Sequence, residues 1–264
     1  MPSSYTHYRF GRDVLALLPP ERREAICRHR ALFDLGLHGP DLFFFHKPYQ
    51  VNSINAMGRR MHTVSGKEVF HRFAVLRERT AHPEAVQAYL DGFLCHVVLD
   101  SVCHPYVTEI TANSSISHMQ LEMELDRAFL VADGHDPLRQ SLTAHLRPTA
   151  QCAGVVAELF PQLTSQQALQ CIRQMISYEA LLLAPGKPKR LALQQLFRAM
   201  GQESTFGARM MSEKPRSACV PLVARLQQRY DSALPLAAEL LSDPDLSHSQ
   251  YQLNFAGIAA EEDV

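Results

Sequence analysis

A single stretch, residues 89–105, restricts most strongly what this chain can fold into. It reads YLDGFLCHVVLDSVCHP, and when it is wound as an α-helix apolar side chains surround it almost completely. Such a helix is expected to be buried on all sides, yet His96, Asp100 and His104 follow one another at intervals of four residues along one face. A buried carboxylate is unfavourable by several kcal/mol unless it is paired or binds a metal. Because the stretch contains no Lys or Arg, we expect a cation from elsewhere against this face.

A second helix, expected at residues 115–131, repeats this arrangement. His118 and Glu122 lie one turn apart on its apolar face, where packing alone would favour Leu or Ile. Two inward-facing pairs of His and carboxylate on neighbouring helices favour a metal site. Imidazole and carboxylate ligands without thiolate suit zinc in a catalytic setting, and they also suit manganese or iron.

The rest of the chain also has helical patterns, separated by Pro and Gly, and it contains no alternating strand pattern of useful length and no internal repeat. The predicted fold class is therefore all-α, and by its length the chain can form one large domain or two small ones. Residues 243–264 are expected to be a partly disordered tail. The further expected helices span residues 6–18, 21–37, 66–79, 82–104, 148–160, 165–184, 189–201 and 219–241, with an irregular segment at 46–64.

Composition excludes several function classes and leaves the oligomeric state open. The 264 residues are 46% hydrophobic with a formal net charge of −1, so no basic surplus indicates a stable nucleic-acid complex. Residues 1–20 lack a basic start followed by an uninterrupted apolar run, and no later segment reads as long and uncharged enough to span a bilayer. Six cysteines without a CxxC pair suit reduced thiols. We expect a cytoplasmic protein that is not an integral membrane protein.

At the level of motifs the chain resembles a known family. The run at 89–105 is followed by SHMQLE, and it is preceded by THYRFG near the start and by GPDLFFF before a later MH. This set, in this order, resembles the zinc-dependent phospholipase C family, whose bacterial phospholipases share an all-α fold and a three-zinc site with the fungal single-strand nucleases. The resemblance covers about residues 1–130. It implies a single-domain multi-helix bundle of the same type over residues 1–242, with the metal site within residues 1–131 and a helical scaffold over 132–242.

The resemblance also implies a set of metal ligands and two or three zinc ions per chain. In the characterised enzymes the amino group of an N-terminal Trp completes the third site; this chain has no Trp, and the amine of Pro2 is a candidate substitute. The implied ligands are Asp41, His62, His96 and Asp100 for one zinc ion, His104, His118 and Glu122 for a second, and His7, with Asp100 as a bridge, for a third.

The implied activity is that of a metal-dependent phosphoric ester hydrolase, a phospholipase C-like phosphodiesterase in which water activated by several zinc ions attacks phosphorus in line. Asp41 would be the catalytic base or the carboxylate that orients the water. The substrate is a phosphate ester, whether phospholipid, nucleotide or other. Basic side chains near the implied ligands are candidates for holding the phosphate, although solvated surface charge explains each of them as well. They are Arg9, Arg12, Lys47, Arg59 and Arg60.

Two other readings of the same residues stay open. Di-iron and di-manganese helical-bundle proteins also place His and carboxylates on facing helices, but they draw ligands from four helices in more symmetric pairs. The isolated residues His7, Asp41 and His62 fit the phospholipase pattern better. The second alternative is a non-catalytic protein that keeps the metal to stabilise a scaffold.

Overall fold

The structure, a computed structural model, describes residues 4–204, 206–243 and 245–259. Across these ranges it is built of helices without a β-strand, apart from one isolated bridge between Leu253 and Ala259. This confirms the all-α prediction. In chain order the elements are α1 (Ser4–Leu17), α2 (Pro20–Cys27), α3 (Arg30–Gly36), the 3-10 helix η1 (Gly39–Phe45), α4 (Ser53–Met61), α5 (Gly66–Arg77), α6 (Pro83–Ala112), α7 (His118–Ala132), α8 (Ala150–Leu159), α9 (Ser165–Leu182), α10 (Lys187–Ala199), η2 (Gly207–Arg209), η3 (Ser217–Cys219), α11 (Val220–Ser242) and η4 (Ser249–Gln252).

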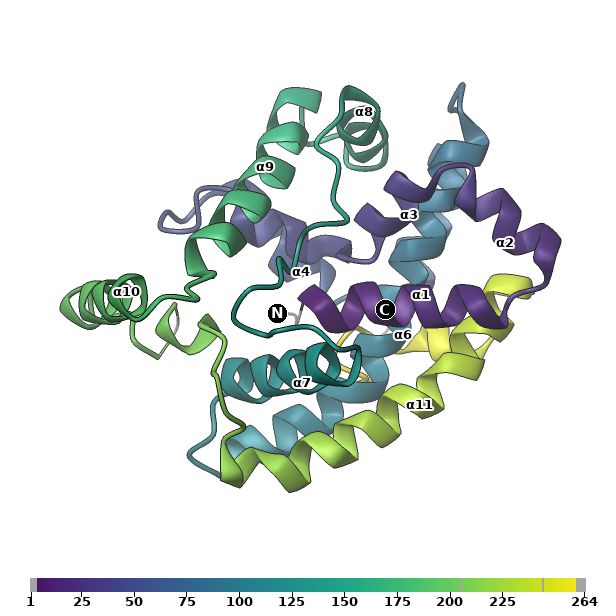
Figure 1. Cartoon of the computed structure of the whole chain (residues 1–264). Coiled ribbons are helices and arrows are strands. Elements are labelled where there is room, and N and C mark those ends of the chain that lie inside the picture. The colour runs from purple at the N-terminus through teal and green to yellow at the C-terminus, as the bar shows by residue number, and fades with distance from the viewer. Residues whose placement is uncertain (1–3, 205, 244, 260–264) are drawn as a thin grey trace.

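Helix α6 is the central element. Helices α1, α3, α7 and α11 all pack against it, and Figure 1 shows α1, α7 and α11 lying together across its middle and lower part. Contrary to the expectation from sequence, α6 is long and apolar enough to cross a bilayer. However, 89% of its most apolar window is buried inside the protein, so its apolar surface contacts other helices of the same chain.

Two glycines allow α3 and α6 to cross with their backbones in contact. A Cβ on Gly36 would overlap the carbonyl of Tyr89, and a Cβ on Gly92 would overlap the carbonyl of Phe33. The chain then turns at Gly39, whose φ of +48° lies in the left-handed region and whose Cα lies against the ring of His96. This close approach brings η1, which begins immediately after α3, onto the face of α6 that carries His96.

Three local predictions differ from the structure. The helix expected at residues 21–37 is two helices, because His29, at φ −121° and ψ 36°, leaves the helical region. The segment expected to be irregular at 46–64 contains α4, which is capped by the side chain of Asn52 through the backbone N–H groups of Ile54 and Asn55. Helix α6 was expected to end before Pro105, but it continues to Ala112. The proline removes one backbone hydrogen bond, and packing of the following turns against the rest of the protein offsets this loss.

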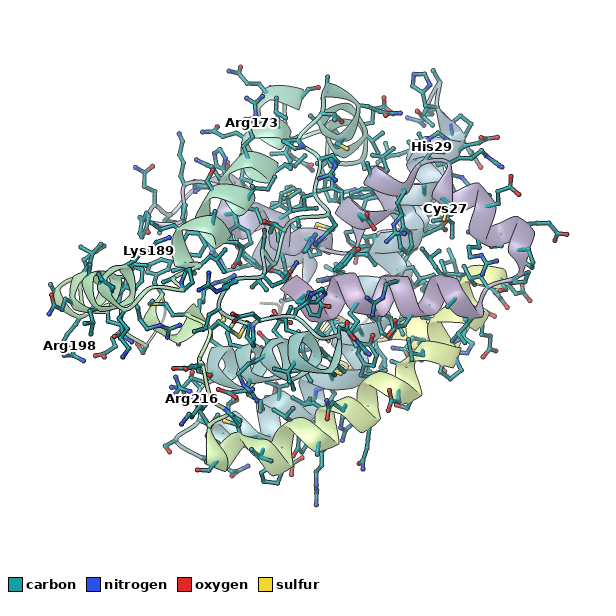
Figure 2. All side chains as sticks on the ribbon, in the orientation of Figure 1. Cys27, His29, Arg173, Lys189, Arg198 and Arg216 are labelled. Carbon is teal, nitrogen blue, oxygen red and sulfur yellow. The ribbon has the colours of Figure 1, made fainter. Side chains whose placement is uncertain are left out.

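The C-terminal segment is packed where disorder was expected. Tyr251 and Phe255 are buried, and the carbonyl of Phe255 accepts a hydrogen bond from His104 Nδ1 at 2.9 Å. Residues 260–264 of the predicted tail lie outside the described residues. Helices α9 and α10 carry charged side chains such as Arg173 and Arg198 on their outer surface (Figure 2).

Candidate metal centre

Four of the predicted ligands meet at the middle of α6. His96 and Asp100 of α6, His7 of α1 and Asp41 of η1 place one ligand atom each within 4.8 Å of one another. The Nε2 atom of His7 lies 3.1 Å from Asp100 Oδ1, and Nε2 of His96 lies 3.3 Å from Asp100 Oδ2. All four side chains are buried. The sequence therefore brings together residues from three separate elements at one buried point.

His62, at the C-terminal end of α4, joins this group through Asp41. Its Nε2 atom lies 3.0 Å from Asp41 Oδ1, whereas His96 Nε2 lies 3.8 Å from the other oxygen, Oδ2. Helix α4 reaches this position because Gly58 packs on Pro40 and Phe43 of η1. Asp41 is therefore between two imidazoles from different helices.

The second predicted ligand set forms a separate group one turn farther along α6. His104 Nε2 lies 3.3 Å from Glu122 Oε1, and His118 Nε2 lies 2.8 Å from the same oxygen. These three residues again offer ligand atoms within 4.8 Å of one another. The side chain of His118 is 38% exposed, whereas those of His104 and Glu122 are 9% and 7% exposed, so this group marks the side on which solvent reaches the centre.

The backbone sets the tautomer of three histidines. Nδ1 of His62, His96 and His104 lies 2.7, 3.2 and 2.9 Å from the carbonyl oxygens of Gly58, Leu37 and Phe255, respectively. A carbonyl oxygen only accepts, so each Nδ1 carries a proton, and in the neutral form of each ring the lone pair of Nε2 is directed at a carboxylate. A lone pair and a carboxylate oxygen repel each other unless a proton or a metal ion lies between them. This is the arrangement in which metal-binding histidines are held by a second hydrogen bond.

The carboxylates of these two groups differ from every other buried carboxylate among the described residues. Asp34, Asp91, Glu124 and Glu179 each pair with an arginine, and Asp126 accepts from the backbone N–H groups of Tyr5 and Thr6. The remaining three pair only with imidazole nitrogens among the described side chains; each also has a buried oxygen without a hydrogen-bond partner, a feature shared by Asp91. They are Asp41, Asp100 and Glu122.

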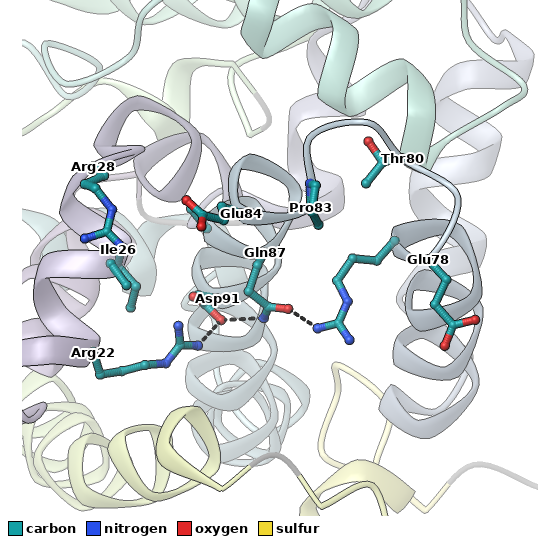
Figure 3. A pocket seen from close by; sticks show the side chains of 12 residues that line it. Arg22, Ile26, Arg28, Glu78, Thr80, Pro83, Glu84, Gln87 and Asp91 are labelled. Carbon is teal, nitrogen blue, oxygen red and sulfur yellow. Dashed lines mark hydrogen bonds and ion pairs between the residues drawn. The ribbon is translucent and has the colours of Figure 1, made fainter.

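Asp91 makes the contrast clear because it lies on α6 only nine residues before Asp100. Its carboxylate accepts from Arg22 of α2 at 2.7 Å and from Gln87 at 2.8 Å. These contacts are dashed in Figure 3, and the pocket drawn there is lined by none of the candidate metal-binding residues. Asp91 thus has the cationic partner that a buried carboxylate requires. Asp100 has no arginine or lysine partner and faces imidazoles instead, which can share either a proton or a metal ion with it.

The ionisation states suit cation binding. Burial acts to raise the pKa of Asp100, but the neighbouring His104 and His96 hold it well below its usual range, and His62 and His96 lower the pKa of Asp41 in the same way. Burial lowers the pKa of His96 to about 4, so its ring is neutral near pH 7. Burial also acts to lower the pKa of His104, yet Asp100 and Glu122 raise it to about 9, which shows how strongly this group attracts positive charge.

Two of the predicted phosphate-binding residues are engaged elsewhere. Arg9 and Arg12 both pair with Asp133, at 3.1 and 3.0 Å. Arg59, Arg60 and Lys47 are exposed. Arg209, far along the chain, is buried, and its guanidinium pairs with Glu179 at 2.7 Å.

A second histidine pair was not anticipated. His38 and His145 stack with ring centroids 5.0 Å apart, and their Nε2 atoms lie 2.8 Å from each other. The ring of Tyr8 also stacks on that of His145, with centroids 4.1 Å apart. His145 lies in an irregular segment 107 residues after His38, so no helical periodicity could have joined the two.

A comparison with protein families agrees with this geometry. A family model described as zinc dependent phospholipase C matches residues 6–155, more than half of the chain. The chain belongs to this family. The matched interval contains all eight predicted ligands and extends beyond residue 130, where the motif resemblance ended. No curated protein and no solved structure matches the chain.

Membership confirms the predicted class of activity. The zinc-dependent phospholipase C family consists of metal-dependent phosphoesterases, so the chain is a zinc-dependent hydrolase of phosphate esters. The two groups of buried His and carboxylate are the candidate zinc-binding residues. Family membership favours zinc over the iron or manganese of the alternative helical-bundle reading. Pro2, the candidate substitute for an N-terminal Trp, lies outside the described residues.

Proposed function

We propose that the eight side chains hold two or three zinc ions and hydrolyse a phosphodiester. His104, His118 and Glu122 would bind one ion, and the larger group would bind the remaining one or two. The larger group consists of His7, Asp41, His62, His96 and Asp100. The observation that carries this proposal is that three buried carboxylates face imidazole nitrogens and have neither an arginine nor a backbone N–H as partner.

When bound, zinc lowers the pKa of water towards neutrality and polarises a phosphoryl oxygen. The residues of the chain then have distinct tasks. His62, His96 and His104 are fixed in orientation by their backbone carbonyl partners, so they hold their ligand atoms in place without rearrangement during the reaction.

Asp41 is assigned the role of orienting the attacking water. Burial opposes its ionisation, but His62 and His96 lower its pKa, so it is a weak base that stays charged near pH 7. A carboxylate of this kind accepts a hydrogen bond from water and directs its lone pair towards phosphorus. Proton uptake by Asp41 itself is less favourable than it would be for a carboxylate of ordinary pKa.

The substrate would approach from the side of His118. That side chain is 38% exposed, and the side chain of His62 is 18% exposed, whereas Asp41 and His96 are fully buried. The phosphate therefore meets the outer ligands first, and the buried ligands hold the ions from behind.

Hydrolysis of bis(p-nitrophenyl) phosphate and of p-nitrophenyl phosphate by the zinc-loaded protein tests the proposal. We expect the diester to be cleaved, the activity to disappear when a chelator removes the metal, and zinc to restore it. Protein that carries at least two zinc ions per chain and cleaves neither ester would show that the centre is structural. In that case the reading as a metal-stabilised scaffold would replace the proposal.

A further inference from the structure

One buried carboxylate close to the metal centre, that of Asp126 on α7, is held by another helix. Asp126 follows His118 and Glu122 at intervals of four residues, so the three share one face of α7. Its side chain is completely buried. The backbone N–H of Tyr5 lies 3.2 Å from Oδ2, and the backbone N–H and the hydroxyl of Thr6 each lie 2.7 Å from Oδ1. The helix that carries two candidate ligands is thus joined to the start of α1.

These hydrogen bonds cap the first turn of α1. The first N–H groups of an α-helix have no partner inside the helix, and a negative charge beside them is also favourable for the helix dipole. Helix α1 begins at Ser4, so the N–H groups of Tyr5 and Thr6 belong to this turn. The carboxylate that accepts from them lies 120 residues farther along the chain, on a helix that packs against α1 (Figure 1). A tertiary contact therefore fixes where α1 starts.

His7 follows directly after the capped residues, and its ring lacks the anchor that three other candidate ligands have. Nδ1 of His62, His96 and His104 donates to a backbone carbonyl, whereas Nδ1 of His7 is buried and has no hydrogen-bond partner. The His7 ring stacks on that of His96, with centroids 4.4 Å apart, and stacking limits the tilt of a ring more than its position. The backbone of α1 must therefore place Nε2 of His7 at its 3.1 Å distance from Asp100.

We propose that Asp126 is a positioning residue that fixes His7, and through His7 the zinc ion assigned to His7 and Asp100. The inference rests on the proposed function, because it takes His7 to be a zinc ligand. Both oxygens of Asp126 are taken by Tyr5 and Thr6, so Asp126 acts on the centre only through α1. Helix ends fray, and fraying of residues 4–7 would carry the ring of His7 away from Asp100. The cap keeps the ligand atom of His7 in place before zinc binds.

Zinc binding to the full-length protein, measured by competition with a chromophoric chelator of known affinity, tests the proposal and requires no turnover. Burial raises the pKa of Asp126 to about 7, so the measurement is made at pH 8, where the carboxylate is charged. Asp126→Asn keeps the size of the side chain and replaces one acceptor oxygen by an NH2 group. We expect one zinc ion per chain to bind about 10- to 100-fold more weakly, as for loss of a residue that supports a ligand. The other zinc ions should bind as in the native protein.

Two substitutions at Thr6 test the same contact from the side of α1. Thr6→Val removes the hydroxyl that donates to Asp126 and keeps the shape of the side chain. It should weaken binding of the same zinc ion, by less than Asp126→Asn does. Thr6→Ser keeps a hydroxyl at this position and should retain native affinity. This pair decides the question if Asp126→Asn does not fold.

A double-mutant cycle shows whether Asp126 acts through His7. His7→Ala should weaken binding of the same ion, and addition of Asp126→Asn should then cause less than about a twofold further loss. Asp133→Asn is the matched control, because Asp133 also joins α7 to α1, through the Tyr5 hydroxyl and Arg9, but does not accept from the N–H groups next to His7. It should lower the melting temperature in excess chelator and leave zinc affinity unchanged.

Three results would overturn the assignment. They are native zinc affinity in His7→Ala or in Asp126→Asn, equal losses from Asp126→Asn in the native and His7→Ala backgrounds, and equal zinc affinities of Thr6→Val and Thr6→Ser. Each is distinguishable from failure of the proposed function. Native protein that binds zinc through Asp126 and His7 but cleaves no phosphodiester would refute the catalytic role and retain the positioning. Hydrolysis of bis(p-nitrophenyl) phosphate by native protein, with unchanged zinc affinity in Asp126→Asn, would refute the positioning alone.

Discussion

Replacing His118 by Ala is the sharpest test of the second ligand group. The substitution removes one of three ligand atoms, the Nε2 that lies 2.8 Å from Glu122 Oε1. The side chain is 38% exposed and lies outside the apolar core, but it pairs with the buried Glu122, so the zinc-free variant should lose about 1–3 kcal/mol of unfolding free energy. Any larger effect in the presence of zinc therefore reports on metal binding.

The magnitude follows from linkage. Loss of a residue that only supports a ligand costs 10- to 100-fold in metal affinity, so loss of a ligand should cost at least about 100-fold. A hundredfold change corresponds to about 2.7 kcal/mol of stabilisation by bound metal. For a chain of this size, each kcal/mol shifts the melting temperature by about 2–4 °C. We expect zinc to raise the melting temperature of the native protein by about 5–10 °C more than that of the variant, which should contain about one zinc ion fewer.

The assay is elemental analysis of the purified protein together with thermal melting at one fixed free-zinc concentration and in excess chelator. His71→Ala is the matched control, because His71 is exposed on α5 and belongs to neither metal-binding group. Equal zinc content in native protein and His118→Ala, with equal stabilisation by zinc, would refute the assignment of His118 as a ligand.

Three further predictions concern other parts of the centre. Asp41→Asn should lower phosphodiester hydrolysis at least about 100-fold, measured as kcat at saturating zinc, with the helical circular dichroism spectrum unchanged. In zinc-free protein the raised pKa of His104, about 9, stabilises the folded state; this stability is fully present below pH 6.5 and is lost as the pH rises to 9. Thermal melting in chelator should show that the free energy of unfolding falls by about 3 kcal/mol over this range, and bound zinc should suppress the fall. Gly92→Ala should destabilise the protein by about 1–3 kcal/mol in urea titrations, because its Cβ would overlap the carbonyl of Phe33, whereas Gly154→Ala, with open space around it, should not.

Much of the centre could be predicted from local sequence. The spacing of His96, Asp100 and His104, and of His118 and Glu122, places each set on one helical face, and the structure keeps these faces. Asp41 and His62 were predicted to be ligands only from the resemblance to a family, because no pattern in their own segments places them against α6. Their approach depends on the backbone contact of α3 with α6 at Gly36 and Gly92, which is a property of the packed helices.

The parts of the site that the sequence did not reveal come from distant segments. The carbonyl of Phe255 orients His104, although that residue lies in a segment expected to be disordered. Asp126, 120 positions after Thr6, caps the first turn of α1 and so fixes the backbone next to His7. Contacts of this kind follow no local pattern, because only the packed helices bring the two partners together.

Helix α6 shows why the partner of a buried carboxylate is more informative than its burial. Asp91 and Asp100 lie on the same helix and are 2% and 4% exposed, so burial does not distinguish them. The negative charge of Asp91 is compensated by Arg22 of α2, so this ion pair joins two helices. Asp100 faces His7, His96 and His104, and neutral imidazoles cannot compensate a buried charge unless they bind a proton or share a metal ion with it. A fixed guanidinium thus compensates one carboxylate of α6, whereas the other faces groups that can exchange a proton for a metal ion.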